Sequence, residues 1–221
     1  MKKLINGIVE FRRNVQDSYR EAFGRLATGQ SPDALFIACS DSRVAPNVFA
    51  STNPGDVFVL RNVGNLIPPC GIDGVSASDE SEAAAIEYAV QSLHVSNIIV
   101  CGHSECAAMR ALVEDRNKVK TPNLKSWLRH GDPAMAQLRS GAVLDASLSE
   151  HNQLSQLNVL LQMEHVKSYP AVKQRLDEGH LVIHGWWFDL AKADVYAYEE
   201  AQNRFVLIDE EEAQRILSRL E

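Results

Sequence analysis

The sequence predicts an α/β protein, a single domain whose central and mostly parallel β-sheet is flanked by helices. Continuous apolar runs at Ala34–Cys39, 56–61 and Asn97–His103 are typical of short strands that are buried on both faces. Helical patterns lie before, between and after these runs, and such an alternation of strands and helices favours a parallel sheet.

Length and composition support one domain over residues 1–221. At about 150 residues per domain, this length suggests one domain with extensions rather than two. The chain has 22 Lys and Arg against 29 Asp and Glu, a net charge of −7, which argues against nucleic acids and anionic membranes as partners. No apolar run is long enough for a signal peptide or a membrane span, so we expect a cytoplasmic protein with reduced thiols. Association with a bacterial microcompartment stays open.

The remaining segments complete the order of elements. Residues 1–30 predict an amphipathic helical arm, because apolar residues recur at helical spacing between charges: Leu4, Ile8, Phe11 and Val15. Asp79 followed by Glu82 resembles a capping box that opens a helix over 83–93. A helix over 151–165, a strand over 180–188, a polar edge strand and a C-terminal helix follow.

Two short motifs contain residue types that carry chemistry. Cys39-Ser-Asp41-Ser-Arg43 and His103-Ser-Glu-Cys106 each begin where a predicted strand ends, so parallel strands bring them to the same edge of the sheet. Two cysteines and one histidine suit tetrahedral zinc and leave a fourth position open, which is the pattern of a catalytic site. The helix that starts at Cys106 favours its thiolate form.

The other two cysteines have a plainer interpretation. Cys70 and Cys101 are typical of small apolar residues. Cys101 shares a strand face with His103, but as a ligand it would lack the helix end that favours Cys106. A structural zinc site would need a fourth cysteine or histidine, and none lies at matching spacing.

Asp41 and Arg43 could be no more than a turn cap and its ion pair. Beside a zinc-bound water they have a further role, because Arg43 can hold the Asp41 carboxylate ionised and aim it. Asp41 then accepts the proton of zinc-bound hydroxide, so that the oxygen lone pair faces an electrophile. A misaimed Asp41 would block this or become the fourth zinc ligand. Two thiolates reduce the charge of the zinc, so activity should favour mildly alkaline pH.

Together these motifs resemble the β-class carbonic anhydrases, and the similarity continues through Arg61-Asn-Val-Gly-Asn65 and His184-Gly-Trp186, from about Leu4 to Phe205. The resemblance implies a carbonate dehydratase, which reversibly hydrates carbon dioxide to bicarbonate and a proton. It implies one Zn²⁺ per subunit on Cys39, His103 and Cys106, and Asp41 with Arg43 as the catalytic dyad. It also implies a homodimer or a dimer-based higher oligomer.

The resemblance further implies a substrate pocket at the dimer interface. Gln30 would hydrogen-bond bicarbonate, and Phe58, Val63 and Tyr88 would line the apolar side that holds carbon dioxide. Without the resemblance, Phe58 and Val63 would be strand core residues and Gln30 a loop residue. Phe36 stands where members regulated by bicarbonate have tryptophan, so the chain resembles the open, constitutively active subtype.

Two departures and two alternatives accompany this hypothesis. Ala107 replaces the usual glycine after the last ligand, and the connection over 74–82 is several residues longer than usual. The same site could hydrolyse carbonyl sulfide or carbon disulfide, or the fold could be a non-catalytic zinc-stabilised scaffold. His94 is a candidate for proton transfer to solvent, although a surface histidine is the commoner case.

Overall fold

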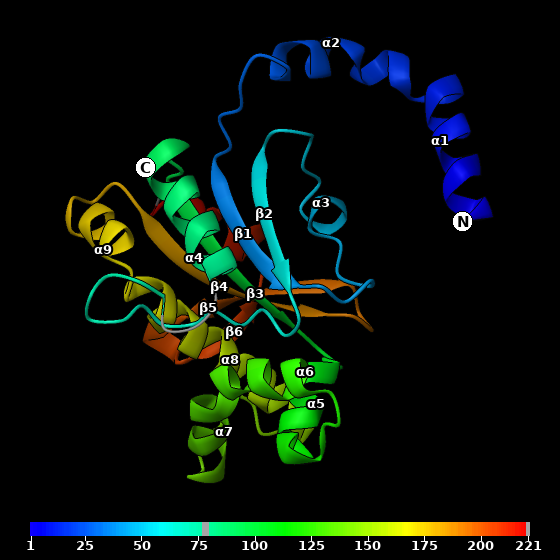
Figure 1. The fold of residues 1–221 in the computed structure, drawn as a ribbon. Coiled ribbons are helices and arrows are strands. Elements are labelled where there is room, and N and C mark those ends of the chain that lie inside the picture. Colours follow the sequence, from blue (N-terminus) through cyan, green and yellow to red (C-terminus); the bar gives the residue numbers. More distant parts are fainter. Residues whose placement is uncertain (77–79, 220–221) are drawn as a thin grey trace.

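One six-stranded sheet forms the centre of the protein (Figure 1), in a computed structural model that describes residues 1–76 and 80–219. Its order is β2-β1-β3-β4-β5-β6. The strands are β1 (Ala34–Cys39), β2 (Val57–Asn62), β3 (Asn97–His103), β4 (Val182–Asp189), β5 (Asp194–Glu199) and β6 (Arg204–Leu207). The first four are parallel neighbours and the last two are antiparallel, so the predicted mostly parallel sheet is confirmed.

Helices surround this sheet in the described residues. They are α1 (Lys2–Asn14), α2 (Gln16–Leu26), α3 (Pro46–Phe49), α4 (Glu80–Glu87), α5 (Ala107–Val113), α6 (Pro122–Trp127), α7 (Asp132–Arg139), α8 (Glu150–Lys167), α9 (Pro170–Asp177) and α10 (Glu210–Leu217). The predicted helix over 83–93 begins at Glu80 and continues as a π-helix over Tyr88–Ser92. Asp79, the expected capping residue, lies outside the described residues. The short helices α3, α6, α7 and α9 were not predicted, whereas α5 is the helix that was predicted to start at Cys106.

The two faces of the sheet are covered unequally. Leu35 and Ile37 of β1 belong to a large core that α4, α8 and α9 complete. Phe36 faces the opposite side, where its ring lies 6.0 Å from that of Phe49 on α3 and 5.8 Å from that of Trp186 on β4. Because both faces of β1 are buried, its sequence is apolar at every position.

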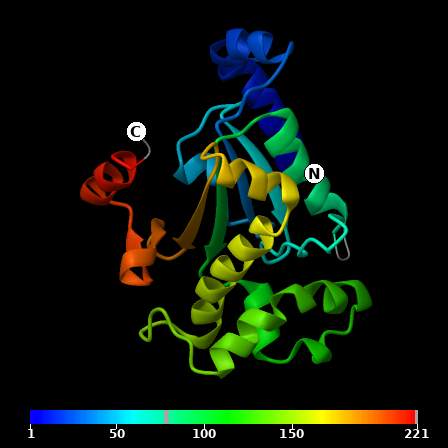
Figure 2. The same ribbon diagram turned by 90° about the vertical axis from the view of Figure 1, so that its left-hand side faces the viewer.

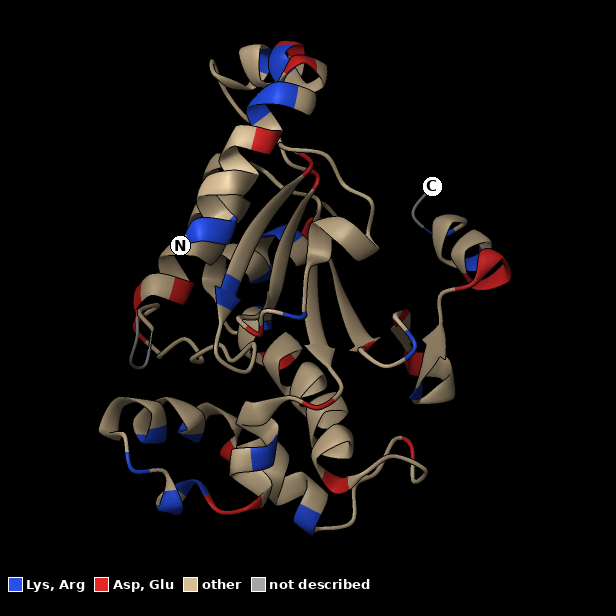
Figure 3. Ribbon diagram, turned by 90° about the vertical axis from the view of Figure 1, so that its right-hand side faces the viewer, with Lys and Arg blue, Asp and Glu red and all other residues tan. Residues whose placement is uncertain are grey.

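The strand order creates a crevice at the carboxyl end of β1. From β1 the chain first adds β2 on one side and then β3 on the other, so the connections after β1 and β3 diverge. Ligands of open α/β sheets bind at such switch points. A helical lobe, α5 to α7, lies at this edge of the sheet and packs against α8 (Figure 2). Basic residues gather on the lobe (Figure 3). Residues 116–131 contain five Lys and Arg and no Asp or Glu.

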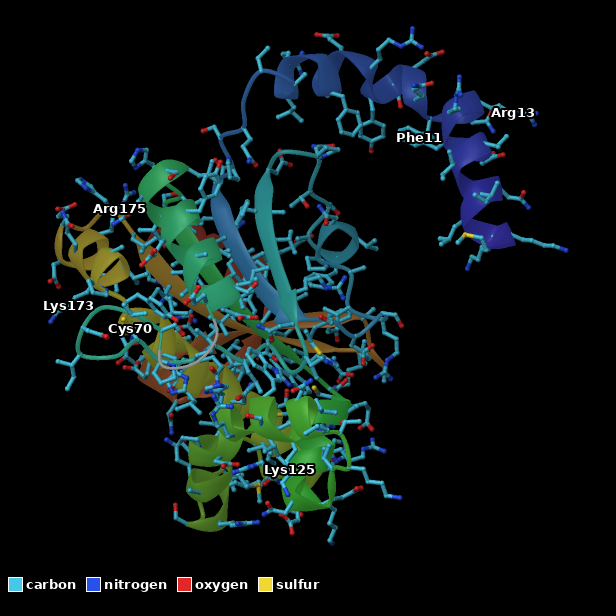
Figure 4. The ribbon with its side chains drawn as sticks, in the orientation of Figure 1. Phe11, Arg13, Cys70, Lys125, Lys173 and Arg175 are labelled. Atoms are coloured by element: carbon cyan, nitrogen blue, oxygen red, sulfur yellow. The ribbon has the colours of Figure 1, made fainter. Side chains whose placement is uncertain are left out.

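The predicted N-terminal arm consists of two helices that project from the body (Figure 1). Neither α1 nor α2 has a buried residue, and the side chains of Phe11 and Arg13 lie far from the sheet (Figure 4). The end of α2 contacts the body, where Leu26 packs closely over Gly55. No helix among the described residues combines the length and the apolar character that crossing a membrane requires.

Candidate metal centre

The three predicted metal ligands meet at the switch point of the sheet. Cys39 is the last residue of β1, His103 is the last residue of β3, and Cys106 directly precedes α5. All three are buried, and their ligand atoms lie within 4.8 Å of one another. The strand ends therefore deliver two sulfurs and one nitrogen to one point, close enough for a single ion to bridge.

The His103 ring is oriented as a metal ligand would need to be. Its Nδ1 lies 2.8 Å from the carbonyl oxygen of Ser104. A carbonyl can only accept, so Nδ1 carries the proton and Nε2 keeps a free lone pair. That Nε2 is fully buried and has no hydrogen-bond partner among the described residues. A buried polar atom without a partner is costly, and a metal ion bound there would remove this cost.

The thiols of Cys39 and Cys106 change each other's pKa in opposite directions. The Cys106 side chain next to Cys39 lowers the pKa of the Cys39 thiol to about 4, and the nearby His103 ring and the Gly64 amide add to this effect against burial. The same neighbour and burial raise the pKa of Cys106 well above its ordinary value. Cys39 is thus the first thiolate of the pair, although the amides of Ala108 and Met109 do favour a Cys106 thiolate, as the helix-end argument predicts.

The loop after β2 supports the Cys39 sulfur. The N–H of Gly64 donates to Cys39 Sγ at 3.3 Å. Gly64 has a φ of +84°, and a Cβ there would lie 2.8 Å from that of Ala108. Only glycine combines this backbone conformation with this close approach to α5. Asn62 closes the loop, because its side chain accepts from the Leu66 amide and donates to the Leu66 carbonyl.

Asp41 and Arg43 form the predicted pair. Arg43 Nε donates to Asp41 Oδ1 at 2.9 Å, and Arg43 Nη2 donates to Oδ2 at 2.7 Å. This two-point contact holds the pKa of Asp41 far below its ordinary value, and burial opposes it only in part. The Asp41 side chain is 14% exposed, so its carboxylate is ionised and held in one direction beside Cys39.

Two residues to which sequence reasoning gave no individual role position this pair. Arg61 donates from Nε to the Cys39 carbonyl at 3.0 Å and from Nη2 to the Asp41 carbonyl at 2.7 Å. The Glu105 carbonyl accepts from Arg43 Nη2 at 3.1 Å. Glu105 adopts a left-handed φ of 56°, and Asn152 of α8 accepts from its amide at 2.8 Å. Arg61 was visible only as part of a family motif, and Glu105 only as a residue between two ligands.

The structure separates the predicted substrate residues into three places. Val63 is 44% exposed and lines a hollow of about 480 Å³ with Ser40 and Trp127. Phe58 lies four residues before Asn62, the strand partner of Cys39, and its ring is 5.8 Å from that of Tyr88. One chain therefore places Val63 at the crevice and the Phe58–Tyr88 pair farther along β2.

Gln30 and His94 lie toward the other edge of the sheet. Gln30 precedes β1, whereas Cys39 ends it, and the six residues of this strand span about 20 Å. Gln30 instead lines a hollow with Tyr19 of α2 and Asp56. His94 precedes β3, whose last residue is His103, so within one chain it is placed too far from the ligands to take a proton directly.

Comparisons with known proteins agree with this geometry. The family model described as carbonic anhydrase matches residues 34–195, which include all three ligand candidates, Asp41 and Arg43. The solved structure of the β-carbonic anhydrase CcaA superposes with a TM-score of 0.86 at 38% identity, covering 94% of this chain and 98% of that chain. The chain belongs to the β-class carbonic anhydrases.

Curated relatives and other structures of this family extend the agreement. The carbonic anhydrase of Pseudomonas aeruginosa is 38% identical over 95% of this chain and 93% of its own length. That of Synechococcus elongatus is 39% identical over 95% of this chain and 76% of its own length. A tetrameric β-carbonic anhydrase of Sordaria macrospora has a TM-score of 0.75 at 28% identity and covers 89% of this chain and 95% of its own. The predictions of the family and of an enzyme of this class are confirmed.

Proposed function

We propose that the chain is a zinc enzyme that reversibly hydrates carbon dioxide to bicarbonate and a proton. The observation that carries this proposal is the convergence of Cys39, His103 and Cys106, with a buried and unpartnered His103 Nε2, beside a fixed Asp41–Arg43 pair. Two thiolates and a neutral imidazole are a donor set that zinc favours, and three ligands leave room for a reacting group. One Zn²⁺ per chain fits this site.

The chain's own residues orient the reaction. Zinc, when bound, supplies a Lewis acid that makes water nucleophilic near neutral pH. Asp41 stays ionised because Arg43 holds both of its oxygens, and it accepts a hydrogen bond from the nucleophile. Arg61 fixes the carbonyls on either side of Ser40, so the carboxylate cannot drift. With both of its oxygens engaged by Arg43, Asp41 is held away from acting as a further metal ligand, which supports the open subtype.

The substrate pocket requires a second copy of the chain. Val63 reaches the crevice of its own chain, whereas Gln30, Phe58 and Tyr88 lie elsewhere, so in the proposed assembly they would complete the pocket of a partner chain. Exposed apolar side chains favour such an assembly, both on the edge strand β2 (Val59) and on the arm (Leu4, Ile8 and Phe11). A homodimer, or a tetramer such as that of the Sordaria relative, would bring these groups together. Location in the cytoplasm stays a prediction.

The test is to replace Asp41 and a matched aspartate. Asp41→Asn removes the charge that aims the nucleophile, and we expect carbon dioxide hydration in stopped flow to fall by about 100- to 1,000-fold, as for other aligned polar groups. Zinc content should stay at one per chain. The matched control is Asp132→Asn, because Arg116 holds Asp132 in the same two-point geometry away from the ligands.

Three outcomes would count against the proposal. A zinc-loaded, folded wild-type protein without hydration activity at mildly alkaline pH would refute it, and would favour the scaffold hypothesis. Faster turnover of carbonyl sulfide or carbon disulfide than of carbon dioxide would reassign the substrate. Equal loss of activity in the Asp41 and Asp132 variants would show that Asp41 has no special role.

A further inference from the structure

We propose that the indole of Trp127 is a positioning group for the metal centre and acts on the Cys39 sulfur through one peptide unit. Trp127 Nε1 donates to the Val63 carbonyl at 2.7 Å. The N–H of the same peptide unit belongs to Gly64 and donates to Cys39 Sγ at 3.3 Å. The indole and the sulfur therefore lie at the two ends of a single amide. This inference rests on the proposed zinc site.

The two hydrogen bonds strengthen each other. A donor on the carbonyl oxygen polarises the amide, which makes its N–H a better donor on the other side. A hydrogen bond to a thiolate is charge-assisted and draws electron density from the sulfur. A less electron-rich sulfur passes less charge to a bound metal ion, so the ion keeps more of its own. Outer partners tune ligands in this way at many metal sites.

The loop is held by contacts that do not involve Trp127. Asn158 of α8 donates to the Gly64 carbonyl at 3.2 Å, and the Asn62 side chain closes the turn onto Leu66. Gly64 is also packed against Ala108 of α5. Because these contacts belong to the neighbouring peptides, loss of the indole N–H should leave the loop in place and weaken only the Val63–Gly64 amide as a donor.

The lobe presents the indole in one orientation. Trp127 ends the short helix α6, and its ring packs edge-on against His130 with 5.4 Å between the ring centroids. Trp127 also lines the same hollow as Val63 and Leu124. A tryptophan in this place could simply anchor the lobe to the body. The anchoring role and the polarising role differ in one respect, since only the second acts on the electrons of Cys39.

The experiment compares variants of Trp127 in cobalt-substituted protein. Trp127→Phe removes the N–H and part of the ring. A second variant replaces the indole by the isosteric 3-benzothienyl group, which keeps the size and lacks the N–H, so it decides the matter if Trp127→Phe fails to fold. Loss of the hydrogen bond raises the energy of the sulfur electrons. The thiolate-to-cobalt charge-transfer band should therefore move to longer wavelength in both variants. Hydration kcat in the zinc enzyme should fall about 3- to 10-fold, less than the 10- to 100-fold typical of groups that contact a ligand directly.

The control is Trp186→Phe, which removes an indole from the aromatic cluster beside Phe36 on the other side of β1. Its cobalt band should stay at the wild-type wavelength. A wild-type band in the benzothienyl variant would overturn the inference, whatever happens to activity, because a purely anchoring tryptophan predicts that result. A wild-type enzyme without hydration activity would refute the proposed function instead, and the band comparison would still decide the role of Trp127.

Discussion

The metal edge of the sheet and the N-terminal arm are built on opposite principles. At the metal edge, Cys39, His103 and Cys106 are all buried, and contacts from β2, α5, α6 and α8 hold the surrounding loops. In the arm, α1 and α2 bury nothing, and apolar side chains such as Leu4 and Ile8 are more than half exposed. The first region is held together within one chain, whereas the second exposes apolar side chains that we propose a partner chain covers.

This difference separates metal binding from substrate binding. The three ligand candidates and the Asp41–Arg43 pair need only the fold of one chain, so we expect a monomer to hold the proposed ion. Three of the four predicted substrate residues lie away from the ligand candidates of their own chain: Gln30 in a hollow with Tyr19 and Asp56, and Phe58 paired with Tyr88. Catalysis should therefore depend on assembly more strongly than metal binding does.

The largest expected effect comes from breaking the metal edge itself. Cys39→Ser replaces a thiolate by a weak ligand, so zinc content should fall far below one per chain and hydration activity by more than about 100-fold, beyond the range of outer partners. Atomic absorption and stopped flow measure the two quantities.

The matched control is Cys70→Ser, because Cys70 is outside the ligand group and half-buried. It should keep its zinc and its activity. Full zinc content in Cys39→Ser would contradict the ligand assignment.

A smaller effect should follow removal of the arm. Deletion of residues 1–26 removes no buried side chain, so the body should stay folded with one zinc per chain. The exposed apolar face would be gone, so analytical ultracentrifugation should detect dissociation to monomers, with a reduced kcat/KM. An arm-deleted protein that keeps both its oligomeric state and its kcat/KM would remove the contrast between the two regions.

The smallest expected effect is on the pH dependence of the free energy of unfolding. Burial lowers the pKa of His165, whose Nδ1 lies 2.7 Å from the Ile67 carbonyl at the end of the metal-edge loop. The unfolded chain then binds this proton more readily than the folded one. The contribution of neutral His165 to the free energy of unfolding should therefore be fully present above about pH 6.5, the ordinary histidine pKa. It should decrease as the pH falls below that value.

Urea titrations between about pH 7.5 and about pH 5.5, a range centred on the ordinary histidine pKa, measure how the free energy of unfolding changes with pH. His165→Gln should flatten this slope while costing some stability at neutral pH through the lost contact. An unchanged slope in that variant would assign the acid sensitivity to other groups, of which half-buried His184 is the first candidate because partial burial lowers its pKa as well.

Local patterns determined much of this protein. The apolar run over Ala34–Cys39 matches β1 at both ends, because a strand buried on two faces has no polar position to blur its limits. The two ligand motifs could be combined from sequence because parallel strands end at a common edge. In the lobe the helix after Cys106 was predicted, whereas α6 and α7 escaped prediction because they are short, and packing rather than a long amphipathic pattern stabilises them.

The sequence by itself determined the fold class, the family and the residue types of the metal site. Only the tertiary structure decided which groups support them: Arg61 donates to two carbonyls, the Glu105 carbonyl accepts from Arg43, and Trp127 binds the peptide unit whose N–H donates to Cys39. It also placed Gln30 and His94 away from the ligands of their own chain. The physical reason is that periodicity and motif spacing report burial and chain direction, whereas these hydrogen bonds join residues 20 to 64 positions apart and depend on how strands and helices pack.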